Sequence, residues 1–113
     1  MYYYVIMKYK LNSKTKQLFG AFLKLKDVNE VANFCRDLMT ESEIEEFSGR
    51  FDVALSLAKG RSQRKTAEET GVSIATVTRV NQWLKRGMNG YQTVISRINK
   101  SHQHSSKLLA SGR

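Results

Sequence analysis

Residues 62–86 read SQRKTAEETGVSIATVTRVNQWLKR, a spacing typical of two short helices joined by a tight turn. A helix-turn-helix needs a small residue where its helices cross, a glycine at the turn, and apolar residues on the inner face of the second helix. The sequence supplies these as Ala67, Gly71, Val77 and Val80, with Ile74 and Leu84 extending the apolar set. Ser73 is placed to cap the second helix. We therefore predict a helix-turn-helix over residues 62–86.

The outer face of the second predicted helix carries small, hydroxyl, amide and cationic side chains. Methyl groups, hydroxyls and arginine forks suit the edges of bases in a major groove. The side chains and amide N–H groups at the start of the first predicted helix can bind phosphate. The DNA-binding residues predicted from this face and this helix start are Gln63, Arg64, Lys65, Ser73, Ala75, Thr76, Thr78, Arg79 and Gln82. The alternative is an ordinary helical hairpin with a solvated, charged outer face.

The charge of the chain is concentrated in its second half. The 113 residues hold 19 Lys and Arg against 10 Asp and Glu, a net charge of +9. Residues 1–60 hold nine basic and eight acidic side chains, whereas residues 61–113 hold ten basic and two acidic ones. Such an asymmetry favours a polyanionic partner, because neutralising phosphates releases counterions.

The rest of the chain also predicts helices. It contains no proline, and its apolar residues recur at spacings of three and four. Capping residues Ser13, Asp27 and Thr40 begin three helices before the motif, and Glu43 completes a capping box with Thr40. Gly60 ends the third helix. A last helix spans residues 89–100, so we predict an all-α fold of about six helices.

The predicted domain organisation is simple, since a chain of this length forms one domain. Residues 1–12 are expected to be a poorly ordered extension, residues 13–100 a single helical domain, and residues 101–113 a flexible tail. The apolar opening run is too short for a membrane span and lacks the basic start of a signal peptide. We therefore expect no membrane partner, and the single Cys35, which excludes an internal disulfide, fits a reducing cytoplasm.

An enzyme is not expected. The acidic cluster Glu41, Glu43, Glu45 and Glu46 is explained by a helix start, where carboxylates complement the helix dipole. The single cysteine and the two histidines, His102 and His104, do not form a zinc-binding pattern. No glycine-rich phosphate loop is present. We expect no catalytic residue, no metal and no cofactor.

The motif region resembles the trp repressor family. The resemblance covers residues 38–86. It rests on Leu38–Thr40, Glu41–Glu43, Arg50, Lys59–Gly60, Ser62–Arg64, Gly71, Ile74–Arg79 and Leu84–Lys85. The shorter link from Gly60 to Gly71 and the pair Arg79–Val80 look more like the TrpR-related YerC/YecD branch than like the tryptophan-sensing repressor itself.

The resemblance implies an intertwined all-α homodimer that places two reading heads on successive major grooves of operator DNA. Transferred by position, it also implies that operator DNA contacts Gln63, Arg64, Ile74, Ala75, Thr76 and Thr78, with Arg79 near a phosphate. It also implies a bacterial cytoplasmic regulator of transcription, acting as a repressor. In tryptophan-sensing members, Thr40, Arg50 and Arg79 would match residues around the corepressor, with two arginine planes enclosing the indole.

Two positions depart from the tryptophan-binding pattern. Val80 stands where those members have glycine, and Trp83 stands where they have serine. Overfilling an apolar site costs about 1 to 3 kcal/mol before a ligand arrives. We therefore expect a plugged pocket and DNA binding without L-tryptophan, either with Trp83 as an internal substitute or with Trp83 as an ordinary core aromatic.

The leading interpretation is thus a dimeric, sequence-specific transcription regulator that reads DNA with the helix at residues 73–86. Two other classes stay open. One is the DNA-binding domain of a transposase or recombinase, and the other is a basic module that binds an acidic protein. The last class predicts no steep salt dependence with duplex DNA.

Overall fold

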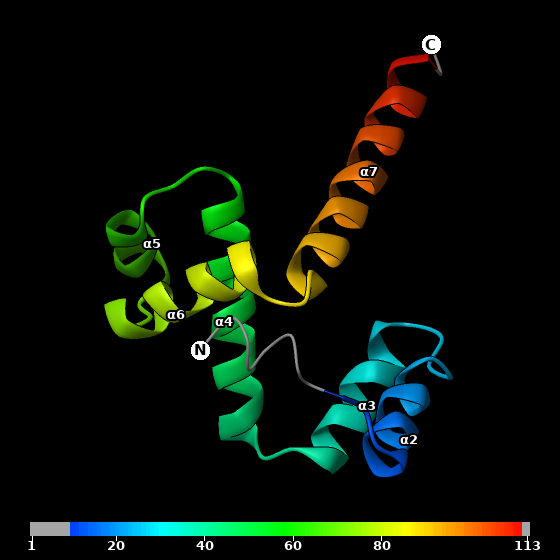
Figure 1. Ribbon diagram of the computed structural model, residues 1–113. Helices are drawn as coiled ribbons and strands as arrows, with labels where there is room; N and C mark the ends of the chain where they lie inside the picture. The colour runs from blue at the N-terminus through cyan, green and yellow to red at the C-terminus, as the bar shows by residue number, and fades with distance from the viewer. Residues whose placement is uncertain (1–9, 112–113) are drawn as a thin grey trace. The chain divides into compact units, whose positions relative to one another are not determined.

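The computed structural model describes the backbone of residues 10–111 and the side chains of residues 10–102. Within that part, the chain forms six helices and no strand (Figure 1). They are α2 (Ser13–Phe22), α3 (Val28–Leu38), α4 (Glu41–Ala58), α5 (Gln63–Thr70), α6 (Ile74–Arg86) and α7 (Gly90–Ser111). The predicted all-α class and the number of helices are confirmed.

Local capping explains where the first three helices begin. Asp27 Oδ1 accepts the Glu30 N–H at 2.9 Å, as predicted for α3. At α4, Thr40 Oγ1 accepts the Glu43 N–H at 3.1 Å while Glu43 Oε1 accepts the Thr40 N–H at 2.9 Å. The two groups thus satisfy each other's amides, which confirms the predicted capping box.

The predicted cap of α2 was wrong by one residue. Asn12, not Ser13, is the N-cap, and its side chain accepts the Thr15 N–H at 2.9 Å. The Thr15 hydroxyl accepts the Asn12 N–H in return at 3.0 Å. Asn12 prevails because Thr15 lies three residues after it and completes a capping box, an advantage that Ser13 lacks.

The predicted end of the last helix was also wrong. We placed it at residue 100, whereas α7 continues to Ser111. No proline or glycine interrupts residues 91–111, so the backbone hydrogen-bond pattern has no local reason to stop. Residues 1–9 of the predicted extension and residues 112–113 of the predicted tail lie outside the described part.

The structure contains two compact units, residues up to Ser48 and residues from Gly49 onward. In the first unit, Phe22 of α2 packs edge-on against Phe34 of α3 with ring centroids 5.2 Å apart. Neither helix has a buried residue, although all their side chains are described. The described residues of the first unit, 10–48, therefore form no closed core within one chain.

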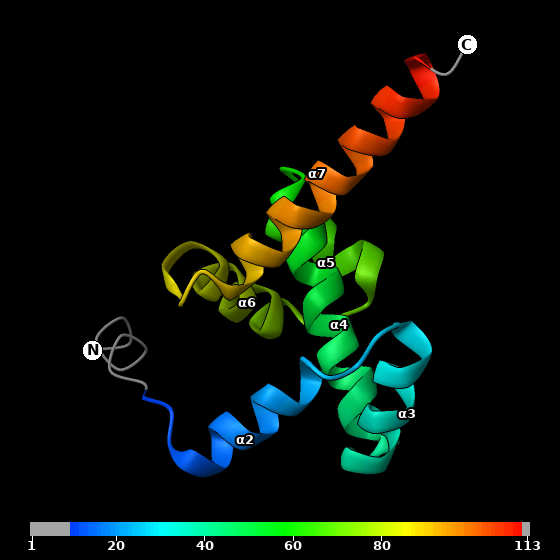
Figure 2. The ribbon, with the colours of Figure 1, turned by 90° about the vertical axis from the view of Figure 1, so that its right-hand side faces the viewer.

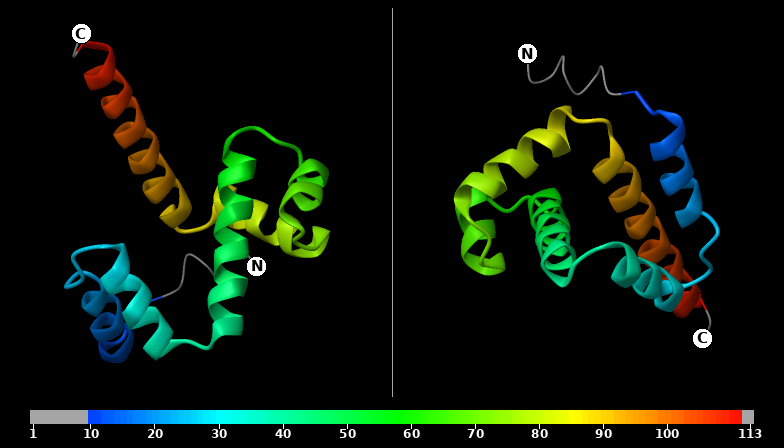
Figure 3. Two further views of the ribbon diagram at one scale, coloured as in Figure 1. Left: turned by 180° about the vertical axis from the view of Figure 1, so that it is seen from behind. Right: turned by 90° about the horizontal axis from the view of Figure 1, so that it is seen from below.

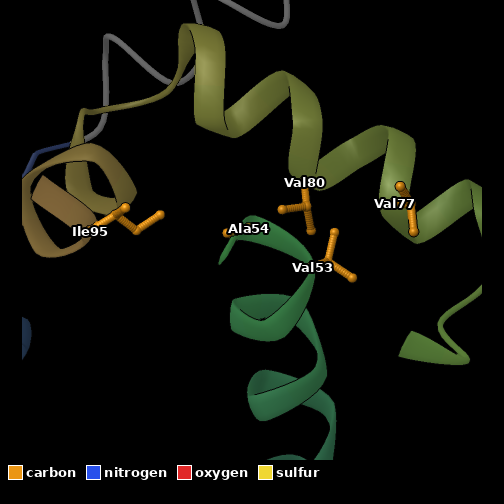
Figure 4. Close-up of a cluster of buried hydrophobic side chains, with 5 residues drawn as sticks. All are labelled: Val53, Ala54, Val77, Val80 and Ile95. Carbon is orange, nitrogen blue, oxygen red and sulfur yellow. The ribbon is translucent and has the colours of Figure 1, made fainter. Parts of the chain in front are cut away.

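The second unit does have a closed core. Val53 and Ala54 of α4 and Val77 and Val80 of α6 are fully buried, and Ile95 of α7 is nearly so. Figure 4 shows the two valines of α6 lying over Val53 and Ala54. Figure 3 shows α5 and α6 joined by their tight turn, and Figure 2 shows α7 as the long helix that follows α6. This core fixes the motif that carries the candidate site.

Candidate nucleic-acid interface

The turn between α5 and α6 has the geometry that the sequence predicted. Gly71 is the C-cap of α5 in the left-handed conformation, with φ of 75°, and its N–H donates to the Ala67 carbonyl at 3.0 Å. The Thr70 hydroxyl donates to the Thr66 carbonyl at 2.7 Å and accepts the Val72 N–H at 3.3 Å. These bonds hold the turn, so the angle between the two motif helices is set locally.

The second motif helix docks by its apolar face. Val77 and Val80 are fully buried, and Trp83 and Leu84 are partly buried against the same cluster. The Ser73 side chain accepts the Thr76 N–H at 3.3 Å and caps the helix as predicted. Ile74 is the exception, because its side chain is 54% exposed and does not extend the core.

The outward face of α6 then consists of the predicted DNA-binding residues. Thr76 is half-buried and the others are exposed, namely Ser73, Ile74, Ala75, Thr78, Arg79 and Gln82. Because the valines of the same helix are locked in the core, this face points away from it. The exposed Ile74 thus adds an apolar group to a polar surface, where a thymine methyl is a suitable contact.

The start of α5 departs from the prediction in one respect. Gln63 is half-buried, and Arg64 and Lys65 are exposed, as phosphate contacts require. The Lys65 N–H, however, donates to the capping Ser62 Oγ at 3.0 Å. A cap satisfies the third amide of a helix in this way, so this N–H was wrongly counted as open to phosphate.

One acidic residue lies among the cations of α5. Glu69 Oε1 lies 3.2 Å from Arg61 Nε, and its Oε2 lies 3.8 Å from Lys65 Nζ. All three side chains are exposed, so these pairs contribute little to stability. They nevertheless reduce the positive charge that Lys65 can offer to a phosphate, while Arg64 has no such acidic contact among the ion pairs of the described residues.

A side-chain hydrogen bond joins the two motif helices. The Thr78 hydroxyl of α6 donates to Gln63 Oε1 of α5 at 2.8 Å. Both residues were predicted DNA contacts from separate helices, and the structure brings them together. Sequence reasoning placed the two residues on one surface but gave no indication that they bond to each other.

A second group of residues connects α4 to the end of α6. The Arg50 guanidinium carbon lies 5.9 Å from the centre of the Trp83 ring, within the range of a cation–π interaction. Phe51 stacks on Tyr91 of α7 with ring centroids 6.4 Å apart. Burial raises the pKa of the Tyr91 hydroxyl, and the nearby Arg50 charge lowers it by a smaller amount. The tyrosine is therefore neutral beside the arginine.

The three predicted ligand residues have separate local roles. Thr40 is engaged in the capping box of α4, Arg50 lies against Trp83, and Arg79 is exposed on α6. Their common role around a small molecule stays a prediction. Among the described residues, no group of three or more His, Cys, Asp or Glu side chains is placed to hold a metal ion.

Two buried residues escaped the sequence analysis. Val53 is fully buried, although the sequence analysis did not assign it to the core. Thr66 is also fully buried, and its hydroxyl lies 2.8 Å from Ser56 Oγ on α4. The signal for Thr66 was its short side chain, which fits where α5 meets α4.

Comparison with known proteins places this geometry in a family. The family model described as Trp repressor protein matches residues 13–99. The uncharacterised protein YerC of Bacillus subtilis is 38% identical over 90 residues, which cover 80% of this chain and 86% of YerC. This agrees with the predicted resemblance to the YerC branch.

Two solved structures share the fold. A TrpR-like protein from Eubacterium eligens superposes with a TM-score of 0.74 at 42% identity, covering 78% of this chain and 91% of its own. A candidate Trp repressor from Staphylococcus aureus superposes with a TM-score of 0.75 at 32% identity, covering 79% and 89%. No helix in the described part of the chain is long and apolar enough to cross a membrane. With its helix-turn-helix and these relatives, the chain belongs to the Trp repressor family of DNA-binding regulators of transcription.

Proposed function

We propose that this protein is a homodimeric repressor that reads an operator sequence in the major groove with α6 and its cap, residues 73–86, without L-tryptophan. The observation that carries the proposal is the docking of α6. Its valines, Val77 and Val80, are fully buried while Ala75, Thr78 and Arg79 are exposed on the other face. A helix held in this way presents a rigid polar face to DNA, as helix-turn-helix proteins require.

Charge supports duplex DNA as the partner. Residues 61–86 hold six basic and two acidic side chains, and four of the basic ones, Arg64, Arg79, Lys85 and Arg86, form none of the ion pairs found among the described residues. Cations spread over both motif helices can neutralise several phosphates, which makes affinity fall steeply with salt. An acidic protein partner would not need the methyl and hydroxyl groups that α6 presents between these charges.

The apolar surface of α2 and α3 supports a homodimer. Leu23 and Val28 are more than four-fifths exposed, and Phe19, Val31 and Leu38 are each more than one-third exposed. Exposed apolar patches of this kind mark protein interfaces. A second copy of the chain offers the same apolar helices in return, so a symmetric dimer buries both sets together.

The surroundings of Trp83 support binding without tryptophan. Val80 is fully buried against α4, which leaves no room for a ligand at that side chain. The Trp83 indole lies beside the Arg50 guanidinium, the pairing that the family resemblance assigns to Arg50 and a bound corepressor. The chain thus supplies from its own sequence an aromatic ring that tryptophan would otherwise supply. The bacterial relatives support a location in the bacterial cytoplasm.

Selection from a random pool of DNA duplexes at physiological salt, with and without L-tryptophan, tests the proposal. We expect two half-sites about one helical turn apart, enriched equally in both arms. Enrichment only with tryptophan would contradict the plugged pocket. No enrichment in either arm would contradict operator binding and favour a protein partner.

A matched pair of arginine variants then tests the interface on the selected duplex. Arg64→Ala is expected to weaken binding by about 1 to 3 kcal/mol if the side chain contacts a base, and to weaken all sequences alike if it contacts phosphate. Arg97→Ala, an exposed arginine on α7 outside the motif, is the control. Equal losses for the two variants would show that Arg64 has no specific role.

A further inference from the structure

The hydrogen bond between Thr78 and Gln63 combines an adaptable side chain with a fixed one. Gln63 has a long side chain that samples many rotamers when it is unrestrained. Thr78 is β-branched and stiff, and it lies on α6 next to Val77, which is fully buried. In a helix the χ1 angle of threonine is restricted to two rotamers, and the bond to Gln63 Oε1 at 2.8 Å selects one of them and restrains the glutamine.

The backbone of Gln63 is restrained as well. It is the first residue of α5 and follows the capping Ser62, whose Oγ accepts the Lys65 N–H at 3.0 Å. With the main chain fixed by the cap and the carboxamide oxygen fixed by Thr78, the remaining group, Nε2, has a set direction. The motif thus contains a glutamine that is oriented before any ligand binds.

The chemistry of the restrained carboxamide favours one kind of ligand. An amide oxygen that accepts from Thr78 leaves the two N–H groups of Nε2 as donors. Donors bind acceptors, and duplex DNA presents phosphate oxygens along its backbone and carbonyl or ring nitrogen acceptors on base edges. The first helix of a helix-turn-helix crosses the DNA backbone, which places a residue at its start near phosphate.

We propose that Thr78 is a positioning residue: its hydroxyl orients the Gln63 carboxamide so that Nε2 donates to a phosphate oxygen of the bound duplex. This inference rests on the proposed DNA-binding function. It gives the two residues one joint role, in place of two independent contacts. The opposite orientation of the amide would turn its oxygen toward the phosphate and repel it.

A double-mutant cycle tests the joint role. Affinity for the selected duplex is measured by fluorescence anisotropy for Gln63→Ala, Thr78→Val and the double variant. We expect each single change to weaken binding about tenfold and the double variant to weaken it no further, because both changes remove the same contact. Thr78→Ser keeps the hydroxyl and is expected to stay within about twofold of the parent.

Controls separate this effect from damage to the fold. Thr93→Val removes a hydroxyl from an exposed position of α7 and is expected to leave binding unchanged. Circular dichroism melting shows whether each variant is folded. The joint role is wrong if the double variant binds about a hundredfold more weakly than the parent, the product of the two single losses. It is also wrong if Thr78→Ser binds no better than Thr78→Val.

The acceptor is identified with modified DNA. A duplex with one neutral methylphosphonate at the contacted position should bind the parent protein more weakly than the unmodified duplex does. The Gln63→Ala variant should bind the two duplexes equally well. If loss of Gln63 instead relaxes the preference for one base, the donor contacts a base edge and the phosphate assignment is wrong. If the parent protein selects no duplex, the proposed function and this inference are both wrong. If the parent binds DNA but the affinity losses of Gln63→Ala and Thr78→Val multiply in the double variant, only the inference is wrong.

Discussion

Large apolar side chains are exposed in the first unit of the chain, whereas the second unit buries several of them. In α2 and α3 no residue is buried, and both Leu23, the C-cap of α2, and Val28 of α3 are more than four-fifths exposed. In the second unit, Val53, Val77 and Val80 have no exposed surface at all. The first unit is the more apolar of the two, with 24 apolar residues of 48 against 22 of 65, so apolar content alone does not explain which unit has a closed core. What separates them is whether one chain is enough to cover those residues.

The contrast indicates how stability and assembly are divided. The motif-bearing half closes a small core from α4, α6 and α7, which makes the direction of α6 a property of the single chain. The first half gains little from burial within one chain, since apolar area left in water contributes nothing to folding. Its apolar side chains are available for an interface with another copy. The following changes test this division.

The largest effect is expected from a charge in the closed core. Val53→Asp places a carboxylate among fully buried valines and should lower the free energy of unfolding by about 4 kcal/mol or more, because the site has no partner for the charge. Thermal unfolding followed by circular dichroism measures the loss. Ser48→Asp adds the same charge at an exposed position of α4 and should melt like the parent. Equal melting of the two variants would show that the core is not closed.

The next effect concerns the open apolar face. Val31→Asp on α3 should raise the dimer dissociation constant about a hundredfold, because it places a charge in the proposed interface. The core formed by α4, α6 and α7 should stay folded. Sedimentation equilibrium measures the assembly, and Asn33→Asp, an isosteric change at an exposed position of the same helix, is the control. A Val31→Asp dimer as tight as the parent would place the interface elsewhere.

The smallest effect is expected from the polar contact inside the core. Thr66→Val leaves the partly buried Ser56 hydroxyl without the bond that joins it to Thr66 at 2.8 Å, and should cost about 1 to 2 kcal/mol. Adding Ser56→Ala should recover part of that loss, since no hydroxyl then lacks a partner. Urea unfolding measures both, with Thr93→Val as the control. If the free energy of unfolding falls in the double variant by the sum of the decreases in the two single variants, the hydroxyls act separately.

Local signals in the sequence predicted the motif well. Caps at Asp27, Thr40 and Ser73, and the glycine at the turn, act over three or four residues, so the sequence carries the whole interaction. The inner valines of α6 follow from helical periodicity, and the structure confirms them. The exposed face of α6 follows from the same periodicity, although its contact with DNA stays a prediction.

The predictions that were wrong, and the contacts that were missed, have a different cause in common. Ile74 is exposed and Val53 is buried because tertiary contacts, not periodicity, decide which side of a short helix is covered. The bonds from Thr78 to Gln63 and from Thr66 to Ser56 join residues 15 and 10 positions apart. Such pairs depend on how helices cross. The sequence shows which groups are able to bond, and only the fold shows which of them meet.

Under the proposed function, the contact between Arg50 and Trp83 has a consequence for regulation. A dissolved corepressor stabilises its complex by an amount that grows with its concentration, so the activity of a sensor follows the metabolic state of the cell. A ring carried by the chain is present at a fixed ratio of one per protein molecule and does not dilute. If this ring holds α6, the occupancy of an operator follows only the number of protein molecules made, and control passes from the supply of an amino acid to the expression of the gene.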